Sequence, residues 1–165
     1  MEEYLARSAS GQASRRPLVT LSRLLLKNRS HRGYDPRFIV REDQLRRIQI
    51  RETILSPSAR NQQVLRFRPV LADEAPGVLA EIRLGGALPE LHLPLPGTGP
   101  NAFIIVCSTV PEDRYVDIDL GISVQSMLLQ AAEIGLNGIC IGAFDKERIR
   151  QKFHLESEPL LILAI

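Results

Sequence analysis

One segment of the chain, residues 117–135, limits the possible folds more than any other. It begins with acidic residues and ends with glycine, the pattern expected of one long helix. Apolar side chains occur on nearly every side of that helix: Ile118, Leu120, Ile122, Val124, Met127, Leu128, Leu129, Ala131, Ala132 and Ile134. A helix that is apolar all round has to be buried. Since a single domain of this size can hardly cover both faces, we expect a second subunit to cover the rest.

Length and charge narrow the class of protein. The chain has 165 residues and a formal net charge of +2, which suits one domain with one core and favours neither nucleic acid nor a membrane surface as partner. No apolar run reaches the roughly 18–20 residues of a membrane-spanning helix. Residues 1–16 lack the apolar stretch of a secretory signal. We therefore expect a flexible polar arm over 1–16, one domain over 17–165, and a cytoplasmic protein.

Cysteine and histidine show no pattern of metal ligands. Cys107 and Cys140 lie in apolar, strand-like runs, so we predict two buried free thiols in a reducing compartment. His31 and His154 have no partner at metal-ligand spacing, and His92 is expected at the surface of a Pro-rich loop. The sequence therefore assigns no metal ligand and no catalytic side chain.

Apolar periodicity predicts the other elements. Residues 103–107 are apolar throughout, as in a strand buried on both faces. Residues 88–100 hold four prolines and two glycines, which predicts an extended loop. Asp145 is placed to cap the last helix. Further helices are expected over 17–27, 42–54, 75–84 and 146–153, and further strands over 64–70, 139–141 and 160–165.

Three separated segments carry residues suited to a cofactor. The first, residues 27–35, follows a predicted helix and contains Asn28, Arg29, Ser30 and Arg32. Arginine offers a planar fork that matches phosphate oxygens, and a serine hydroxyl adds a compact donor. An ordinary helix C-terminus, where cations oppose the helix dipole, explains the same residues.

The second segment, residues 56–63, contains Pro57, Ser58, Asn61 and Gln63. Pro57 ends the preceding helix, and Ser58 can cap a short turn whose N–H groups suit an electronegative ring edge. Asn61 can both donate and accept hydrogen bonds. A purely structural turn before the next strand is the alternative interpretation.

The third segment, residues 135–144, runs from the strand residue Ile141 into Gly142 and Ala143, before the capped helix. Residues without bulk allow a backbone to approach a flat ring closely. A simple strand-to-helix turn also needs small residues, so this segment alone does not distinguish the two interpretations.

In this order, over most of residues 18–165, the three segments resemble the FMN-dependent nitroreductase family. Arg29 to Arg32 fits the family's Arg-Arg-Ser-x-Arg pattern with Asn28 in place of the first arginine, and 57–63 fits Pro-Ser-x-x-Asn-x-Gln, with Val64 at the usual following proline. Ala143 matches the position whose N–H points at flavin N5 in the family. This sequence is short for the family, whose members often have a tail with another phosphate contact and an arm around the partner. Two alternatives follow: the tail lies outside this sequence, or the site is more open.

The resemblance implies an α+β fold with a central mixed sheet flanked by helices, in a homodimer built around the helix 117–135. FMN is then expected in two clefts between subunits, with Arg29 and Ser30 at the phosphate and Arg32 near the ribityl chain and the N1–O2 edge. Each cleft would take those residues from one chain and Pro57, Ser58 and Asn61 from the other. The loop 88–100 is expected to wall the substrate side.

The activity that the resemblance implies is a ping-pong reaction. NADH or NADPH reduces FMN and leaves, and a small oxidant such as a nitroaromatic or a quinone then enters the same pocket. Two alternatives stay open at this point: an FMN-binding protein without reductase turnover, used for storage or sensing, and a scaffold without cofactor. The candidate cofactor-binding residues are Asn28, Arg29, Ser30, Arg32, Pro57, Ser58, Asn61, Gln63, Ile141, Gly142 and Ala143.

Overall fold

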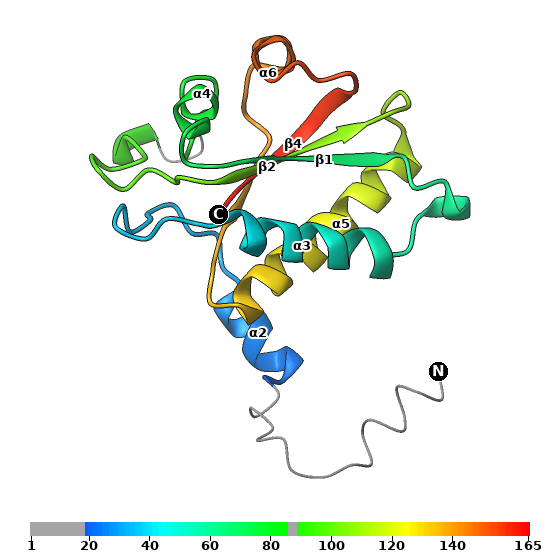
Figure 1. Cartoon of the computed structure of the whole chain (residues 1–165), viewed down its shortest axis with the longest axis horizontal. Coiled ribbons are helices and arrows are strands. Elements are labelled where there is room, and N and C mark those ends of the chain that lie inside the picture. The colour runs from blue at the N-terminus through cyan, green and yellow to red at the C-terminus, as the bar shows by residue number, and fades with distance from the viewer. Residues whose placement is uncertain (1–18, 86–88) are drawn as a thin grey trace.

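A four-stranded sheet forms the centre of the computed structural model, which describes residues 19–85 and 89–165 (Figure 1). The strands β1 (Leu65–Val70), β2 (Phe103–Ser108), β3 (Ile139–Ile141) and β4 (Glu158–Ala164) lie in the order β1-β2-β4-β3. The α+β class is confirmed, and the N-terminal arm predicted for 1–16 lies outside the described residues.

The strand directions differ in one respect from the mixed sheet that was expected. Every described pair of neighbouring strands is antiparallel. β2 and β3 do run in the same direction, as strands joined by a helical crossover usually do. β4 inserts between them, however, so that no two neighbours are parallel.

Helices cover both faces of this sheet (Figure 1). On one face lie α3 (Glu42–Leu55) and α5 (Arg114–Glu133), and on the other lie α4 (Ala75–Leu79) and α6 (Lys146–Lys152). A short helix, α2 (Leu21–Lys27), packs against α5. Short 3-10 turns occur at Ala59–Asn61 and Pro89–Leu91.

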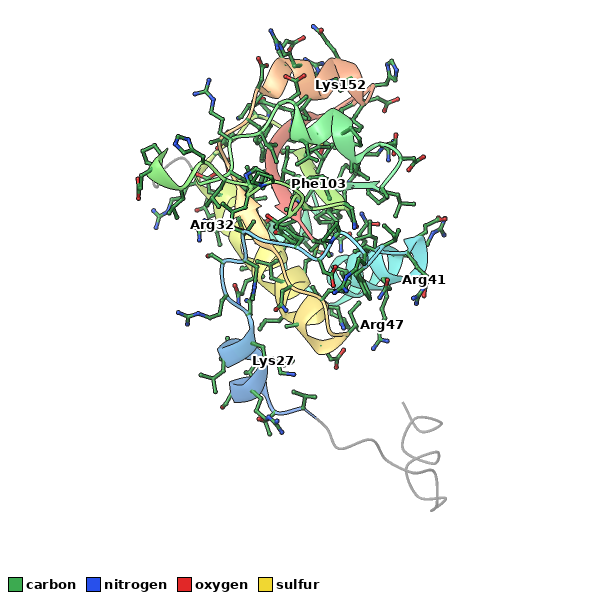
Figure 2. The ribbon with its side chains drawn as sticks, turned by 90° about the vertical axis from the view of Figure 1, so that its left-hand side faces the viewer. Lys27, Arg32, Arg41, Arg47, Phe103 and Lys152 are labelled. Carbon is green, nitrogen blue, oxygen red and sulfur yellow. The ribbon has the colours of Figure 1, made fainter. Side chains whose placement is uncertain are left out.

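Among the described residues, two large apolar clusters, one on each face of the sheet, make up most of the core, and a third, smaller cluster joins Val64, Val116 and Leu160. β2 is buried at all of its positions, which confirms the prediction for 103–107. Its residues alternate between the faces as a strand requires: Ile104 and Val106 join α3 and α5 in one cluster, whereas Phe103 and Ile105 join α4 and α6 in the other. Phe103 accordingly lies in the middle of the molecule in Figure 2.

The long helix α5 begins one turn earlier than predicted. The carboxylate of its N-cap residue, Asp113, accepts hydrogen bonds from the N–H groups of Tyr115 and Val116 at 2.8 and 2.9 Å. Its C-terminal end is where the sequence placed it. Gly135 has a φ of 85°, and the N–H of Leu136 bonds to the carbonyl of Ala131 at 2.9 Å, which is the Schellman geometry.

The helix predicted for 75–84 is shorter than expected, because α4 ends at Leu79. Gly77 weakens its middle, and the chain then leaves the helix to pair with another segment. Ile82 forms a β-bridge with Phe144, and the Arg83 N–H donates to the carbonyl of Ala143 at 2.8 Å. These bonds, made with a segment about 60 residues away along the chain, replace those that further helical turns would have made.

The first helix also starts later than predicted, at Leu21 with Thr20 as N-cap. Pro17, which was expected to open it, lies outside the described residues. The predicted cap of the last helix is confirmed, since the Asp145 carboxylate accepts the Arg148 N–H at 3.0 Å.

One of the two predictions for cysteine is wrong. Cys107 is buried and free, and burial raises the pKa of its thiol to about 11. Cys140 is free but exposed, because β3 is an edge strand whose isoleucines face the core while Cys140 faces outward.

Within the described residues no helix is both long and apolar enough to cross a membrane. The same part of the chain holds no cluster of three potential metal ligands.

Two helix ends provide a matched test of backbone strain. α6 ends in the same Schellman geometry as α5, but its left-handed residue is His154, at φ 50°. A side chain in that conformation costs roughly 1–2 kcal/mol, partly offset by the greater flexibility of glycine when unfolded. We expect His154→Gly to raise the free energy of unfolding by about 0.5–1 kcal/mol and Gly135→Ala to lower it by a similar amount. Urea unfolding of both variants measures this, and a shift of the same sign in both would contradict it.

Candidate functional site

The first segment leaves α2 in an extended conformation and runs toward the sheet. Asn28 caps α2, its N–H donating to the carbonyl of Leu24 at 2.8 Å. Arg29 and Ser30 are exposed, whereas Arg32 is half-buried. Figure 2 shows Arg32 on the stretch between α2 and the body of the molecule. Its guanidinium donates to the carbonyl of Ser30 at 3.2 Å through one terminal nitrogen, while its Nε is buried without a hydrogen-bond partner.

Tyr34 fixes the far end of this segment. Its N–H donates to the carbonyl of Thr98 at 3.0 Å, which ties the segment to the Pro-rich loop. Its hydroxyl donates to the carbonyl of His31 at 3.1 Å. Burial raises the pKa of Tyr34, against the opposing effect of the nearby Arg32 charge, so the phenol keeps its proton at neutral pH.

The third segment lies beside the first. The His31 N–H donates to the carbonyl of Gly138 at 3.3 Å. A side chain at Gly138 would collide with the carbonyl oxygen of Ala164 on β4, so this close approach requires glycine. The segment then continues through the buried Ile141 to the exposed Gly142 and Ala143.

Backbone pairing and an ion-pair cluster hold the end of the third segment. The carbonyl of Ala143 accepts the Arg83 N–H, and no hydrogen bond from the N–H of Ala143 itself is described. The carboxylate of Glu81 lies 2.8 Å from the Lys152 ammonium and 3.5 Å from the Arg148 guanidinium. These cations, Lys152 foremost, hold the pKa of Glu81 below its usual value. A surface pocket of about 560 Å³ lies here, lined by Arg83, Gly142, Ala143 and Arg148 among others.

The second segment forms a tight loop with an unusual backbone. Ser58 was expected to cap the short turn, but its Oγ accepts the Gln63 N–H at 3.0 Å instead. This arrangement follows from the loop's path, which folds back on Ser58. Arg60, Asn61 and Gln63 have φ values of 53°, 54° and 48°, a left-handed conformation that costs roughly 1–2 kcal/mol for each non-glycine residue. Pro57, Asn61 and Gln63 are exposed, and Ser58 is half-buried.

Two described contacts attach this loop to the N-terminal part of α5. The Ala59 N–H donates to the Asp119 carboxylate, 2.9 and 3.1 Å from its two oxygens. The Arg60 guanidinium lies 5.8 Å from the centre of the Tyr115 ring, within the range of a cation–π contact. Sequence reasoning missed Asp119, since it interpreted the acidic residues at 117–119 only as a helix start. One feature of the sequence could have indicated the role of Asp119: it is an acidic residue inside the predicted helix, between the apolar residues Ile118 and Leu120.

Within one chain, the second segment is far from the other two. Asp119 holds the second segment, and Gly135 precedes the contact between the first and third. These residues are 16 positions apart, roughly 24 Å along a helix at about 1.5 Å per residue. The second segment also leads into β1, whereas the third contains β3. These strands are the opposite edges of the sheet, which three strand spacings separate by roughly 14 Å.

α5 keeps one apolar stripe uncovered in the single chain. Ile118 and Ile122 are 46% and 37% exposed, and Tyr115 is 55% exposed. The neighbouring α2 adds Leu21 and Leu25, at 61% and 49%. The opposite side of α5 packs under the sheet through residues such as Met127 and Ala131. The helix is therefore apolar on two sides, as the sequence indicated, and one chain buries only one of them.

Comparison with solved structures identifies the same architecture elsewhere. A nitroreductase family protein from Clostridium difficile 630 is 24% identical, with a TM-score of 0.68 over 88% of this chain and 83% of that one. A protein from Exiguobacterium sibiricum 255-15, crystallised in complex with FMN, is 17% identical, with a TM-score of 0.72 over 90% and 88%. A variant of an FMN and NADPH-dependent nitroreductase from Sphigopyxis sp. strain HMH is 18% identical, with a TM-score of 0.73 over 88% and 86%. The predicted nitroreductase-like fold is thereby confirmed.

The sequence itself was compared with family models and with curated proteins. No curated protein matches the chain. The model of the Nitroreductase family matches residues 25–165, which include all three candidate segments. The chain belongs to the nitroreductase family.

Proposed function

We propose that this protein is an FMN-dependent oxidoreductase that passes reducing equivalents from NADH or NADPH to a small oxidant such as a nitroaromatic or a quinone. The observation that carries the proposal is the cationic segment 29–32, held beside Gly138 of the third segment. Family membership supports it, as do the FMN and NADPH named for structural relatives. A cytoplasmic location stays a prediction from the sequence.

The donors of the first segment fit a phosphorylated ligand. Arg29 and Ser30 are exposed at the end of α2, where they would bind the FMN phosphate by charge-assisted hydrogen bonds. Arg32 has a buried Nε without a partner, and buried donors in native proteins are normally satisfied. A polar group of the bound cofactor would satisfy it, and the positive charge would favour negative charge on the flavin.

The third segment would contact the ring at the other end of the cofactor. Gly142 and Ala143 are exposed and small, which allows a planar ring to approach the backbone. Ala143 offers an N–H as donor while its carbonyl is held by Arg83. β3 (Ile139–Ile141) separates this donor from the cationic segment, as an elongated ligand with a phosphate at one end requires.

The second segment would come from a partner subunit. Asn61 and Ala143 lie at opposite edges of one chain's sheet, so one ring can contact both only if two chains contribute. The uncovered stripe of α5 offers the surface on which a second copy would pack. A two-fold dimer formed there would make two identical sites.

When bound, FMN would supply the two-electron chemistry that links a nicotinamide donor to the oxidant. The protein's part is to bind and orient the cofactor and to present donors where negative charge develops. The Pro-rich loop, tied to the first segment through Tyr34 and Thr98, would wall the substrate side.

The identity of the cofactor is directly testable. We expect the protein to bind FMN and not FAD, because the cationic segment suits a terminal phosphate and the sequence has no Gly-x-Gly-x-x-Gly loop for a pyrophosphate. Flavin released by heat and separated by HPLC should be FMN, and anaerobic NADH or NADPH should bleach the oxidised-flavin absorption band. FAD, or no flavin after reconstitution, would refute the proposal. FMN binding without bleaching would indicate a storage or sensing protein.

The two arginines should affect different measurements. Arg29→Ala should weaken FMN binding, because it removes a charge-assisted hydrogen bond worth roughly 1.5–3 kcal/mol, about 10–150-fold in affinity. Arg32→Ala should slow flavin reduction more than it weakens binding. Fluorescence titration and stopped-flow reduction measure the two effects. Arg23→Ala, which removes an exposed charge from α2, is the matched control, and identical profiles for Arg29→Ala and Arg32→Ala would contradict the assigned roles.

The homodimer is the third testable element. Burial of each isoleucine of the stripe should stabilise the dimer by roughly 1.5–3 kcal/mol. A charge in the stripe, as in Ile122→Lys, should therefore produce monomers that have also lost FMN. Val110→Lys, at an apolar side chain of similar exposure (39%) outside the stripe, is the control. Sedimentation at micromolar concentration decides the matter, since a wild-type monomer that holds FMN would refute the shared site.

A further inference from the structure

Asp119 is the only charged residue among the buried residues in the described part of the chain. It is 4% exposed. Burying a carboxylate is costly unless its oxygens accept hydrogen bonds. The described donor to both oxygens is the Ala59 N–H, which belongs to the second segment and not to the core of the fold.

The loop around Ala59 is braced internally. The N–H of Asn61 donates to the carbonyl of Ser58 at 3.0 Å, and that of Gln62 to the carbonyl of Ala59 at 3.1 Å. The Gln63 N–H closes the loop on Ser58 Oγ. Because these bonds fix the loop residues relative to one another, the contact at Ala59 sets the direction in which Asn61 and Gln63 face.

Apolar packing does not fill the space beneath this loop. A pocket of about 240 Å³ lies there, and its lining includes Ser58, Gln63, Asp119 and Ser123. Beyond the loop, Val64 is buried, and its carbonyl accepts the Thr109 N–H at 3.0 Å. The loop is thus anchored at its downstream end by β-type pairing and at its upstream end by the carboxylate of Asp119.

From this geometry we infer that Asp119 is a positioning residue for the cofactor site, whose carboxylate holds the 57–63 loop in the orientation that presents Asn61 and Gln63 to the ligand. The inference rests on the proposed function, because the loop's orientation matters only if the loop contacts FMN. In the dimer, Asp119 would lie on the helix of the subunit interface and would align its own chain's loop with the partner's cofactor.

The test compares three variants with the wild type. Asp119→Leu removes the acceptor and should raise the FMN dissociation constant about tenfold or more, the effect expected for a charge-assisted hydrogen bond. Asp119→Asn keeps an amide oxygen as acceptor and should restore affinity to within about threefold of wild type. Asp117→Leu makes the same change at an exposed position of α5 and should leave binding and the dimer unchanged.

Removing the donor tests the same bond from the other side. Ala59 opens the short turn, a position where proline is tolerated, and Ser58 before it is already extended at φ −132° and ψ 152°. Ala59→Pro should therefore weaken FMN binding as Asp119→Leu does. The double variant Ala59→Pro/Asp119→Leu should be no weaker than either single variant, because both remove one bond. Additive losses would overturn the inference.

Hydrogen exchange of the peptide spanning 56–63 in the FMN-free protein separates this inference from the proposed function. The peptide should be protected in the wild type and Asp119→Asn and should exchange faster in Asp119→Leu. Equal exchange in all three, or wild-type FMN affinity in Asp119→Leu, would overturn the positioning role. If the wild type binds no FMN, the proposed function fails, and faster exchange in Asp119→Leu alone still supports the role of Asp119 in holding the loop.

Discussion

The packing of α5 is the constraint on which the rest of the structure depends. One side of this helix supplies a large part of the core on one face of the sheet, through residues such as Val124, Met127 and Leu128. Its two ends hold the candidate segments: Asp119 binds the second near the N-terminal end, and the Schellman turn at Gly135 delivers the chain to Gly138 beside the first. Since the helix is rigid, the second segment is kept at a fixed distance from the first and third segments.

That fixed separation explains why the proposed site needs two chains. No local rearrangement of one chain brings the loop before β1 close to the residues that follow β3, because β2 and β4 lie between them. The same helix has an apolar stripe that its own chain leaves exposed. A two-fold pairing through this stripe would cover it and would also bring the second segment of one chain next to the first and third segments of the other. Dimer stability and cofactor affinity would then depend on the same contact between subunits.

The candidate segments also differ in how they are held. The third is fixed by the backbone, through the close approach of Gly138 to β4 and the bridge between Ile82 and Phe144. The first is held by Tyr34, a half-buried tyrosine whose phenol keeps its proton. The second depends on a buried carboxylate and a strained loop. Strain of this kind persists only where surrounding contacts impose it, and it concentrates at functional sites.

Much of this could be predicted from the sequence, because local chemistry decides it. The buried strand β2 followed from a continuous apolar run, the end of α5 from Gly135, and the cap of α6 from Asp145. The residue types of the three segments indicated the family, which the match over 25–165 confirms. Such features depend on neighbours within a few positions along the chain.

Only the tertiary structure decided what depends on residues distant in sequence. The helix predicted for 75–84 was cut short by pairing with Phe144, and Cys140 is exposed because β3 pairs with β4 alone and lies at the edge of the sheet. The second segment is attached through the hydrogen bond from the Ala59 N–H to Asp119, 60 positions away, and nothing in the sequence near Ala59 indicates that partner. Long-range contacts of this kind depend on how whole layers of helices and strands pack, and the residue pattern of one segment does not identify the segment that it contacts.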